Sequence, residues 1–350
     1  MKPFFERCVL SLFGASIASC DHLLTKAPEP SEAFDAPIEG LIIFSSISPH
    51  IKLTSELEFE HGTEEIKLET ALLDIVLLDE LTVRGGILFS PLGKFNLVHD
   101  GPRNEFTDRP LVSTRIIPTT LSEVGFGCYG AFTPYDNHRL TYEVYVVNGL
   151  NDDVILNGNG TSIPEGRPKT FDEDNNGSPA LLGRLAWQSE FCLELGASVH
   201  TGVYNTFKKE GLVVDDKRRL TIVALDGEFR WNRLLLQREF ARASIQIPPS
   251  LIGLFADAQQ GFYAQTVYDV LRGVFPMFPQ STLAAGIRYE RVDFDAHLRG
   301  DHMQRLTVGT NLRLVPNTVI KLDYQHNWIV DRIGNESRAA LVHFGIATYF

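Results

Sequence analysis

Charged side chains of both signs gather in one segment of the sequence, between Lys94 and Arg115. Such a mixture can bind ions and small polar solutes through charge and hydrogen bonds, with no covalent step. The best local anchor is Arg109-Pro110, because proline fixes the backbone and a guanidinium can bind a carboxylate through two hydrogen bonds. Two arrangements stay open: a loop folded into a pore that narrows it, or an external loop held by its own ion pairs. The titratable residues of the segment are Lys94, His99, Asp100, Arg103, Glu105, Asp108, Arg109 and Arg115.

The sequence lacks the motifs of covalent and metal chemistry. It has no Gly-x-Ser-x-Gly motif and no glycine-rich phosphate loop ending in Lys-Ser/Thr. Cys128 has glycine and tyrosine as neighbours rather than a basic residue, so a nucleophilic thiolate is not expected. No Cys-x-x-Cys pair or Cys/His cluster could bind zinc. We therefore expect no catalytic residues, no metal and no cofactor.

Other charged residues recur at every second position of apolar-polar runs, which places them on one face of each strand. One hypothesis pairs Glu56, Glu58 and Glu123 with Arg84 or Arg184 across a lumen. The other hypothesis, which we favour, is that these side chains keep the inner face of the wall hydrated and pair with side chains on neighbouring strands. Together with His99, Arg103 and Arg109, the expected pore-lining residues are Glu56, Glu58, Arg84, Glu123, Glu143, Arg184, Asp226, Glu239 and Arg288.

The elements that position these residues are β-strands, because polar and apolar residues alternate with a period of two from Glu39 onward. No amphipathic helix of ordinary length is visible. About fifteen strands are expected, and since outer-membrane barrels prefer an even number, we predict about sixteen with one strand missed. The expected ranges are 40–47, 51–61, 65–78, 81–90, 120–133, 139–149, 180–189, 191–204, 219–231, 233–246, 261–271, 282–295, 303–315, 318–330 and 337–350.

Three features favour a closed antiparallel transmembrane barrel over a soluble sheet. The strands approach the ~9–11 residues that cross a bilayer, whereas soluble strands average about 5–6. Short links such as 78–81 alternate with long ones such as 91–119, which is typical of periplasmic turns and outer loops. The chain also ends in an apolar strand whose terminal residue is Phe350, and this resembles the C-terminal insertion signal of bacterial outer-membrane proteins.

Composition agrees with a barrel and excludes other classes. The chain of 350 residues has a net charge of −12, and so lacks the basic footprint that nucleic acid requires. Its 44% hydrophobic residues fit a barrel, in which only alternate strand residues meet lipid. The four cysteines are too few for a disulfide framework.

The first 20 residues have the outline of a secretory signal, with Lys2 and Arg7 before a short apolar run. Ile17-Ala18-Ser19-Cys20 also resembles a relaxed lipobox, in which Cys20 would be lipidated after cleavage. The predicted organisation is a leader of residues 1–20, a polar linker of residues 21–38 and a barrel domain of residues 39–350.

Residues 51–130 carry a more specific likeness. The matching elements include Ser55–His61, Gly85-Gly86 to Gly93, Asn96, His99, Pro102, Arg109-Pro110, Ile117-Pro118 and Glu123–Gly125. The segment resembles the phosphate-selective porin O and P family and its porin-like relatives. The resemblance implies a passive solute channel, often trimeric, with an anion preference in some members. The expected Gly- and Tyr-rich first strand is missing, and the inward faces hold slightly more Asp and Glu than Lys and Arg, so a phosphate preference is not supported.

The sequence therefore predicts a bacterial outer-membrane porin, a passive channel for small hydrophilic solutes or ions with a modest cation preference. Its expected partners are these solutes, outer-membrane lipid and two further copies in a homotrimer, with no nucleic acid. One alternative is a soluble secreted all-β binding protein. A second is an outer-membrane barrel enzyme, for which His200 and His343 are candidates by residue type alone.

Overall fold

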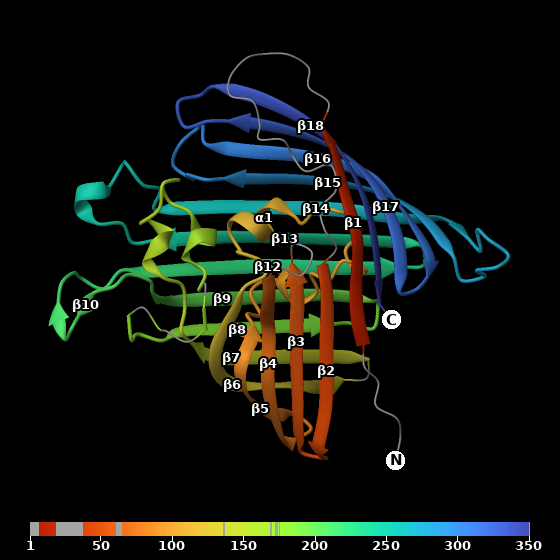
Figure 1. Ribbon diagram of the computed structural model, residues 1–350, viewed down its shortest axis with the longest axis horizontal. Coiled ribbons are helices and arrows are strands. Elements are labelled where there is room, and N and C mark those ends of the chain that lie inside the picture. The colour runs from red at the N-terminus through yellow and green to blue at the C-terminus, as the bar shows by residue number, and fades with distance from the viewer. Residues whose placement is uncertain are drawn as a thin grey trace.

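The computed structural model describes residues 7–18, 38–60, 65–135, 137–168, 170–171, 174 and 176–349. In this part of the chain sixteen strands form one closed antiparallel barrel, and the small hairpin β10–β11 stands apart from it (Figure 1). The barrel strands are β1 (Arg7–Ala18), β2 (Ile38–Ser48), β3 (Ile51–Glu60), β4 (Glu65–Leu78), β5 (Leu81–Phe89), β6 (Ser122–Tyr135), β7 (His138–Val147), β8 (Ala180–Gln188), β9 (Leu193–Val203), β12 (Arg219–Trp231), β13 (Leu234–Ile245), β14 (Ala258–Arg272), β15 (Thr282–Asp293), β16 (His302–Val315), β17 (Thr318–Val330) and β18 (Glu336–Tyr349).

Strand β1 closes the barrel, because it pairs with β2 on one side and with β18 on the other. It is the sixteenth strand that the alternation pattern did not show, and it lies inside the predicted leader of residues 1–20. Leader cleavage and lipidation of Cys20 stay predictions. Cys20, residues 19–37 and Phe350 lie outside the described residues.

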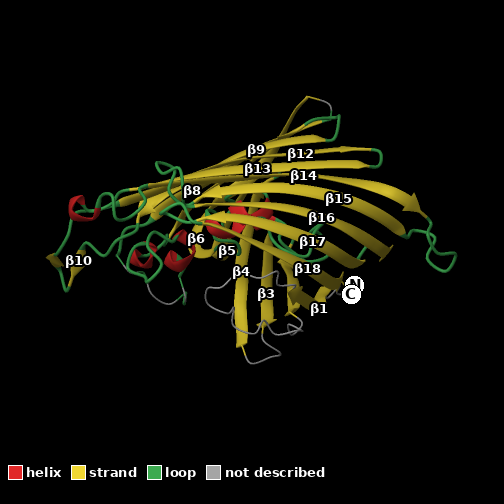
Figure 2. Cartoon of the chain, turned by 90° about the horizontal axis from the view of Figure 1, so that it is seen from above, coloured by secondary structure: helices red, strands yellow, loops and turns green. Residues whose placement is uncertain are grey.

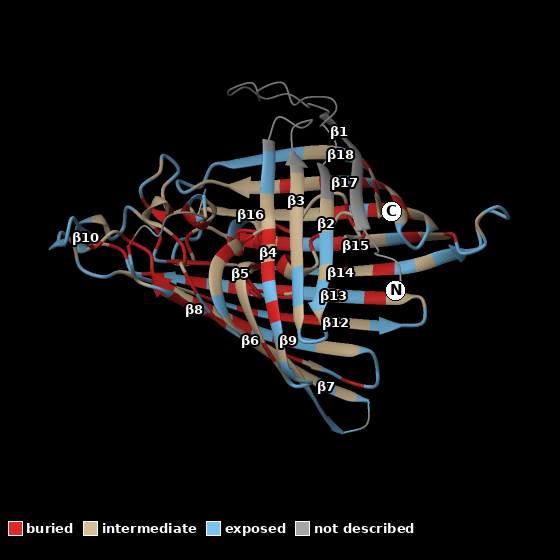
Figure 3. Ribbon diagram, turned by 60° about the horizontal axis from the view of Figure 1, so that its bottom comes forward, coloured by how far each residue is buried: buried red, intermediate tan, exposed pale blue. Residues whose placement is uncertain are grey.

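Side chains alternate across the wall, and the alternation is inverted relative to a soluble protein. Leu185 and Leu225, both 52% exposed, point outward, whereas Gln325 and Glu290 point inward and are fully buried (Figure 3). Burying a leucine side chain stabilises a protein by about 1.5–3 kcal/mol, so a belt of leucines left outside requires lipid around it. The fold is therefore a transmembrane β-barrel of the outer-membrane kind, and the soluble alternative is wrong.

Short turns join the strands at one end of the barrel, and long connections join them at the other. Residues 79–80 and 316–317 are two-residue turns, whereas residues 90–121 and 148–179 are long loops. The loops contain the 3-10 helices η2 (Phe95–Leu97), η3 (Asp152–Val154), η4 (Ile163–Gly166) and η5 (Pro249–Leu251), the helix α1 (Leu111–Arg115), and the strands β10 (Lys208–Lys209) and β11 (Leu212–Val213). No helix in the described residues is long and apolar enough to cross a membrane.

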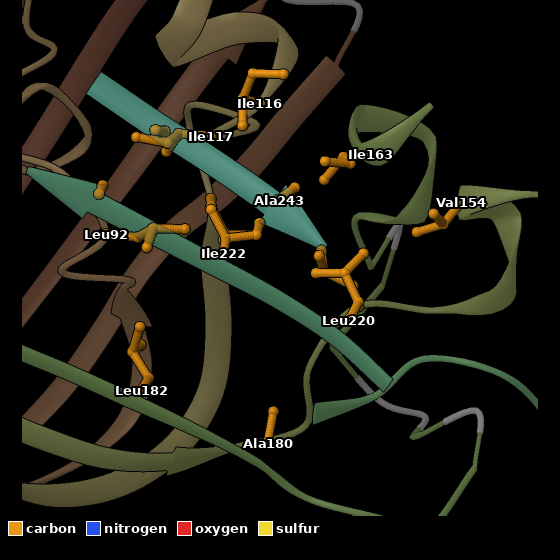
Figure 4. Close-up of a cluster of buried hydrophobic side chains, with 14 of the residues drawn as sticks. Leu92, Ile116, Ile117, Val154, Ile163, Ala180, Leu182, Leu220, Ile222 and Ala243 are labelled. Carbon is orange, nitrogen blue, oxygen red and sulfur yellow. The ribbon is translucent and has the colours of Figure 1, made fainter. Parts of the chain in front are cut away.

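A dry apolar cluster fills part of the barrel interior toward the long loops. Leu92, Ile116 and Ile117 from residues 90–121 pack with Ile222 of β12 and Ala243 of β13 (Figure 4). All five side chains are buried. The inner face is therefore polar along most strands but apolar where the loops cover β12 and β13. The interior thus differs from a lumen that is filled with water throughout.

Candidate functional site: a loop folded into the barrel

The segment between β5 and β6, residues 90–121, folds into the barrel and will be called the inner loop. Helix α1, in its middle, lies among the barrel strands and contacts β13, β14 and β15 (Figures 1 and 2). Gly93 N donates to Ser198 Oγ of β9 at 2.8 Å, and Phe95 N donates to Glu239 of β13 at 3.0 Å. Leu111 N, at the start of α1, donates to Glu290 of β15 at 2.7 Å. The inner loop therefore crosses the lumen, and the alternative of an external loop is wrong.

Cationic side chains of β16 and β17 also hold the same loop. Lys321 of β17 donates to Gly101 O at 2.7 Å, and Arg313 of β16 donates to Pro102 O at 2.8 Å. Arg305 of β16 forms an ion pair with Asp108 at 2.7 Å. Since their donors meet loop oxygens, these cations act as anchors of the loop.

The path of the inner loop depends on two local features. The Asn96 side chain binds both ends of the inner loop. Its Nδ2 donates to Ser90 O at 2.7 Å and to Leu121 O at 3.1 Å, and its Oδ1 accepts from Leu121 N at 2.9 Å. Gly93 has a φ of +70°, and a Cβ there would lie 2.8 Å from Glu239. Only glycine fits both that conformation and that close approach. Asn96 and Gly93 thus fix where the loop turns inward.

Three carboxylates of the β3–β4 wall face the inner loop. Glu69 of β4 lies 3.6 Å from His99 Nε2, and Glu58 contacts Glu69. Glu56 of β3 lies within electrostatic range of Glu69 and His99. Burial opposes protonation of the His99 imidazole, but the hydrogen bond and the negative charge from Glu69 outweigh it and raise the His99 pKa above its usual value of 6.5. Imidazolium and carboxylate therefore face each other at this point.

A polar cavity of about 730 Å³ opens between this wall and the loops. Glu58, Lys67 and Glu69 line it from β3 and β4, and Arg109 and Arg167 line it from the loops. Arg109 donates to Thr119 O and to Thr120 Oγ1, both at 3.3 Å, so within its own loop it binds a carbonyl and a hydroxyl oxygen. The cavity thus combines carboxylates from the wall with guanidinium groups from the loops.

The remaining predicted residues form pairs along the wall. Arg84 binds Asp74 through two hydrogen bonds of 2.7 and 2.8 Å, and the two residues lie on adjacent strands. Arg184 binds Asp226 in the same manner across β9, where a Cβ on Gly196 would lie 2.3 Å from the Arg184 guanidinium. The hypothesis that Arg84 and Arg184 pair with glutamates across the lumen is therefore wrong, because nearer carboxylates are available.

Four further predicted residues are Glu123, Glu143, Arg288 and Arg103. Glu123 of β6 accepts from His200 of β9 at 3.0 Å, and Glu143 accepts from Tyr145 at 2.9 Å. Arg288 lies 3.1 Å from Glu290 and donates to Asp108 O at 3.0 Å. Arg103 is 56% exposed. The structure thus brings Glu56, Glu58, His99 and Arg109 together between the β3–β4 wall and the inner loop. Glu239 and Arg288 instead hydrogen-bond the backbone of that loop.

Sequence reasoning missed several members of this site. Glu69 was not singled out, because a bulge between β3 and β4 shifts the register there and interrupts the period of two. Arg305, Arg313 and Lys321 carried a signal, since each occupies a polar position of a strand. Only the fold shows that these cations bind the inner loop.

Comparison with solved structures agrees with this architecture. The chain is similar to an anion-selective porin from Comamonas acidovorans, with a TM-score of 0.60, 11% identity and 98% of each chain covered. It is similar to the outer-membrane channel DcaP of Acinetobacter baumannii, with a TM-score of 0.60, 10% identity and 99% and 95% of the two chains covered. It is also similar to OprB of Pseudomonas putida, with a TM-score of 0.60, 12% identity and 99% and 94% covered. The fold is porin-like.

Sequence comparison adds less. An uncharacterized protein of Aquifex aeolicus (strain VF5) is 27% identical over 346 residues, a match that covers 90% of this chain and 75% of that protein. No family model matches. The resemblance to the phosphate-selective porin O and P family therefore stays a prediction.

Proposed function

We propose that this porin-like barrel is a passive channel for small hydrophilic solutes or ions across the outer membrane. The observation that carries the proposal is the inner loop, which crosses the lumen and leaves a polar cavity on the β3–β4 side. A constriction with charged walls selects solutes by size and charge and requires no chemical step. Because the apolar cluster fills part of the interior, we expect a conductance well below that of an open barrel of sixteen strands.

Charge around the cavity favours a modest cation preference. Most wall cations are already bound: Arg84 to Asp74, Arg184 to Asp226 and Arg305 to Asp108. Glu58, Glu69 and Glu165 line the cavity against Lys67, Arg109 and Arg167, and Glu56 lies beside Glu69. Arg109 and Arg167 each donate to an oxygen of the inner loop. A bound guanidinium contributes less to the field that a passing ion meets than a carboxylate at the cavity does. A phosphate preference is not part of this proposal.

The experiment is planar-bilayer recording of the refolded chain in a salt gradient. Stepwise openings with a reversal potential of cation sign support the proposal, and Glu69→Gln should move that potential toward zero. Asp269→Asn, at an exposed ion pair on a strand end, is the matched control and should leave it unchanged. A folded barrel that inserts without conductance would overturn the channel, and a strong anion preference would overturn the selectivity.

A catalytic role has little support. Ser90 and His200 both bind Glu123, but Ser90 and Glu123 are fully buried and His200 is 1% exposed, so no substrate reaches them. The homotrimer, the contact with outer-membrane lipid and the leader remain parts of the proposal. Cross-linking of the purified protein tests the trimer.

A further inference from the structure

A guanidinium without a protein partner lies on the apolar outer face of the barrel. Arg238 lies on β13 between Leu236 and Phe240, which point outward and are 37% and 38% exposed. Arg238 is itself exposed, and in the part of the chain that the structure describes it makes no ion pair and no side-chain hydrogen bond. Arg242, four residues later on the same face, donates to Gln260 at 3.0 Å. Arg238 alone of this pair is left without a protein partner.

The neighbours of Arg238 in the sheet are the smallest possible. Gly227 of β12 stands opposite it on one side and Ala264 of β14 on the other. A Cβ on Gly227 would lie 3.3 Å from Arg238 Nε, so the arginine stem lies across the glycine. The two small residues open an apolar groove of about 430 Å³ on the wall. Its other lining residues include Leu193, Leu195, Phe229, Leu236, Ile287 and Tyr289.

The groove lies in the half of the wall nearest the short turns. Arg238 follows the β12–β13 turn by four residues, and Leu193 and Phe229 lie near the same end of their strands. At a rise of about 3.4 Å per residue and a tilt near 40°, the arginine stands about 10 Å above that turn. Trp231, 69% exposed at the end of β12, is suited to the interface on this side. Short turns face the periplasm, so the groove belongs to the inner leaflet.

Charge and shape together define the occupant. An arginine on the lipid face destabilises a barrel most at the bilayer midplane and least near an interface. The flanking outward residues are glycine and alanine, and Glu228, which also lines the groove, binds Lys94 and Gln237 instead. The counter-anion of Arg238 therefore comes from outside the chain. A phosphate group binds a guanidinium through paired hydrogen bonds, and an acyl chain fills an apolar groove.

We propose that this groove is a binding site for an anionic phospholipid of the inner leaflet. The lipid phosphate binds Arg238, and one acyl chain lies in the groove that Gly227, Ala264 and the leucines of β9 and β13 line. The inference is independent of the channel proposal, because it concerns the outer wall.

The test is native mass spectrometry of the full-length barrel, released from detergent with added phosphatidylglycerol or phosphatidylethanolamine. We expect wild type to retain phosphatidylglycerol at least fivefold better than phosphatidylethanolamine, and Arg238→Gln to lose that preference. Arg242→Gln is the matched control and should keep it. Gly227→Leu fills the groove without removing the charge and should also reduce retention, with circular dichroism confirming the fold of every variant.

Several results would overturn the lipid site. Equal retention of both lipids by wild type would show no anion recognition, and unchanged retention in Arg238→Gln would place any lipid elsewhere. Preference for a lipid A phosphate over phosphatidylglycerol would assign the site to the outer leaflet. A change of subunit number in Arg238→Gln would mean that a second copy of the chain occupies the groove.

Discussion

Arg305 of β16 and Asp108 of the inner loop form an ion pair of 2.7 Å inside the barrel. Burial opposes ionisation of Asp108, but the positive charges of Arg305 and Arg288 outweigh it and lower the Asp108 pKa below its usual range. Ion pairing therefore couples the loop to the wall, in addition to the backbone donors that bind Glu239 and Glu290.

Asp108→Asn should loosen the inner loop, because Arg305 loses its nearest counter-charge and keeps only the longer ion pair of 4.0 Å with Glu290, which belongs to the wall. Removing one partner of such a pair costs about 1–3 kcal/mol of local stability. We expect larger and noisier single-channel currents and faster amide exchange in residues 90–121. Asp269→Asn breaks the exposed Arg272 pair and should change neither measurement. Identical currents in both variants would show that the Asp108 pair does not hold the loop.

Low pH should act on the same anchor in wild type. A carboxylate whose pKa is lowered in the folded state stabilises that state above its unfolded pKa, and this stabilisation is lost as pH falls through the folded pKa. The anchoring by Asp108 should thus persist to below about pH 4 and then weaken. Channel noise measured from pH 6 to pH 3 should rise at the acid end in wild type and stay high throughout in Asp108→Asn. A flat profile in wild type would contradict the role of the pair.

His99 predicts a second pH effect, of opposite sign. Its pKa is raised, so the imidazolium stabilises the folded loop fully below about pH 6.5, and this stabilisation is lost as pH rises through the folded pKa. Glu69 and Asp100 favour the charged form of His99, whereas Arg109 opposes it. Loss of this positive charge should increase cation preference above neutral pH.

The measurement for His99 is the reversal potential between pH 6 and pH 9. We expect it to shift toward stronger cation preference in wild type and to stay constant in His99→Gln. His50→Gln is the control, since His50 lies in a turn between β2 and β3, where its ring contacts Val76 O at 3.1 Å. A pH response that survives in His99→Gln would assign the effect to another group.

Gly196→Ala should destabilise the wall on the side of β9. The added methyl group would lie 2.3 Å from the Arg184 guanidinium and 2.5 Å from an Asp226 oxygen, so the two-bonded pair has to move. Overpacking of this kind costs about 1–3 kcal/mol. In Gly183→Ala the nearest neighbour atom lies 3.6 Å away, so this variant should be nearly neutral. Urea unfolding in detergent compares the two, and equal midpoints would contradict the crowding at Gly196.

Asn96→Ala should free both ends of the inner loop at once. The side chain makes three hydrogen bonds, to Ser90 O, Leu121 O and Leu121 N, and it is fully buried. Each buried group left without a partner costs about 1–3 kcal/mol. We expect protease cleavage within residues 90–121 that wild type resists. Asn157→Ala in the neighbouring loop removes bonds of similar length and should leave that segment protected.

The strands of this barrel can be read from the amino-acid sequence alone. All fifteen expected ranges became strands, because a strand that crosses a bilayer with one face in lipid has to alternate apolar and polar residues over its whole length. Strand β1 was missed because its residues Arg7–Ala18 read as the apolar run of a leader. The charged segment 94–115 and its anchor Arg109-Pro110 were also visible, since residue type alone shows charge and proline.

The role of those charges depends on long-range contacts that the fold creates. Glu239 and Phe95 are 144 residues apart in sequence, and Lys321 and Gly101 are 220 apart, so no local pattern brings them together. Whether this loop lies inside or outside the barrel depends on hydrogen bonds between its backbone and side chains of the wall that are far away in the sequence. The pairing of Arg84 with Asp74 rather than with a glutamate across the lumen has a simpler cause: adjacent strands lie about 5 Å apart, and the nearest opposite charge is bound first.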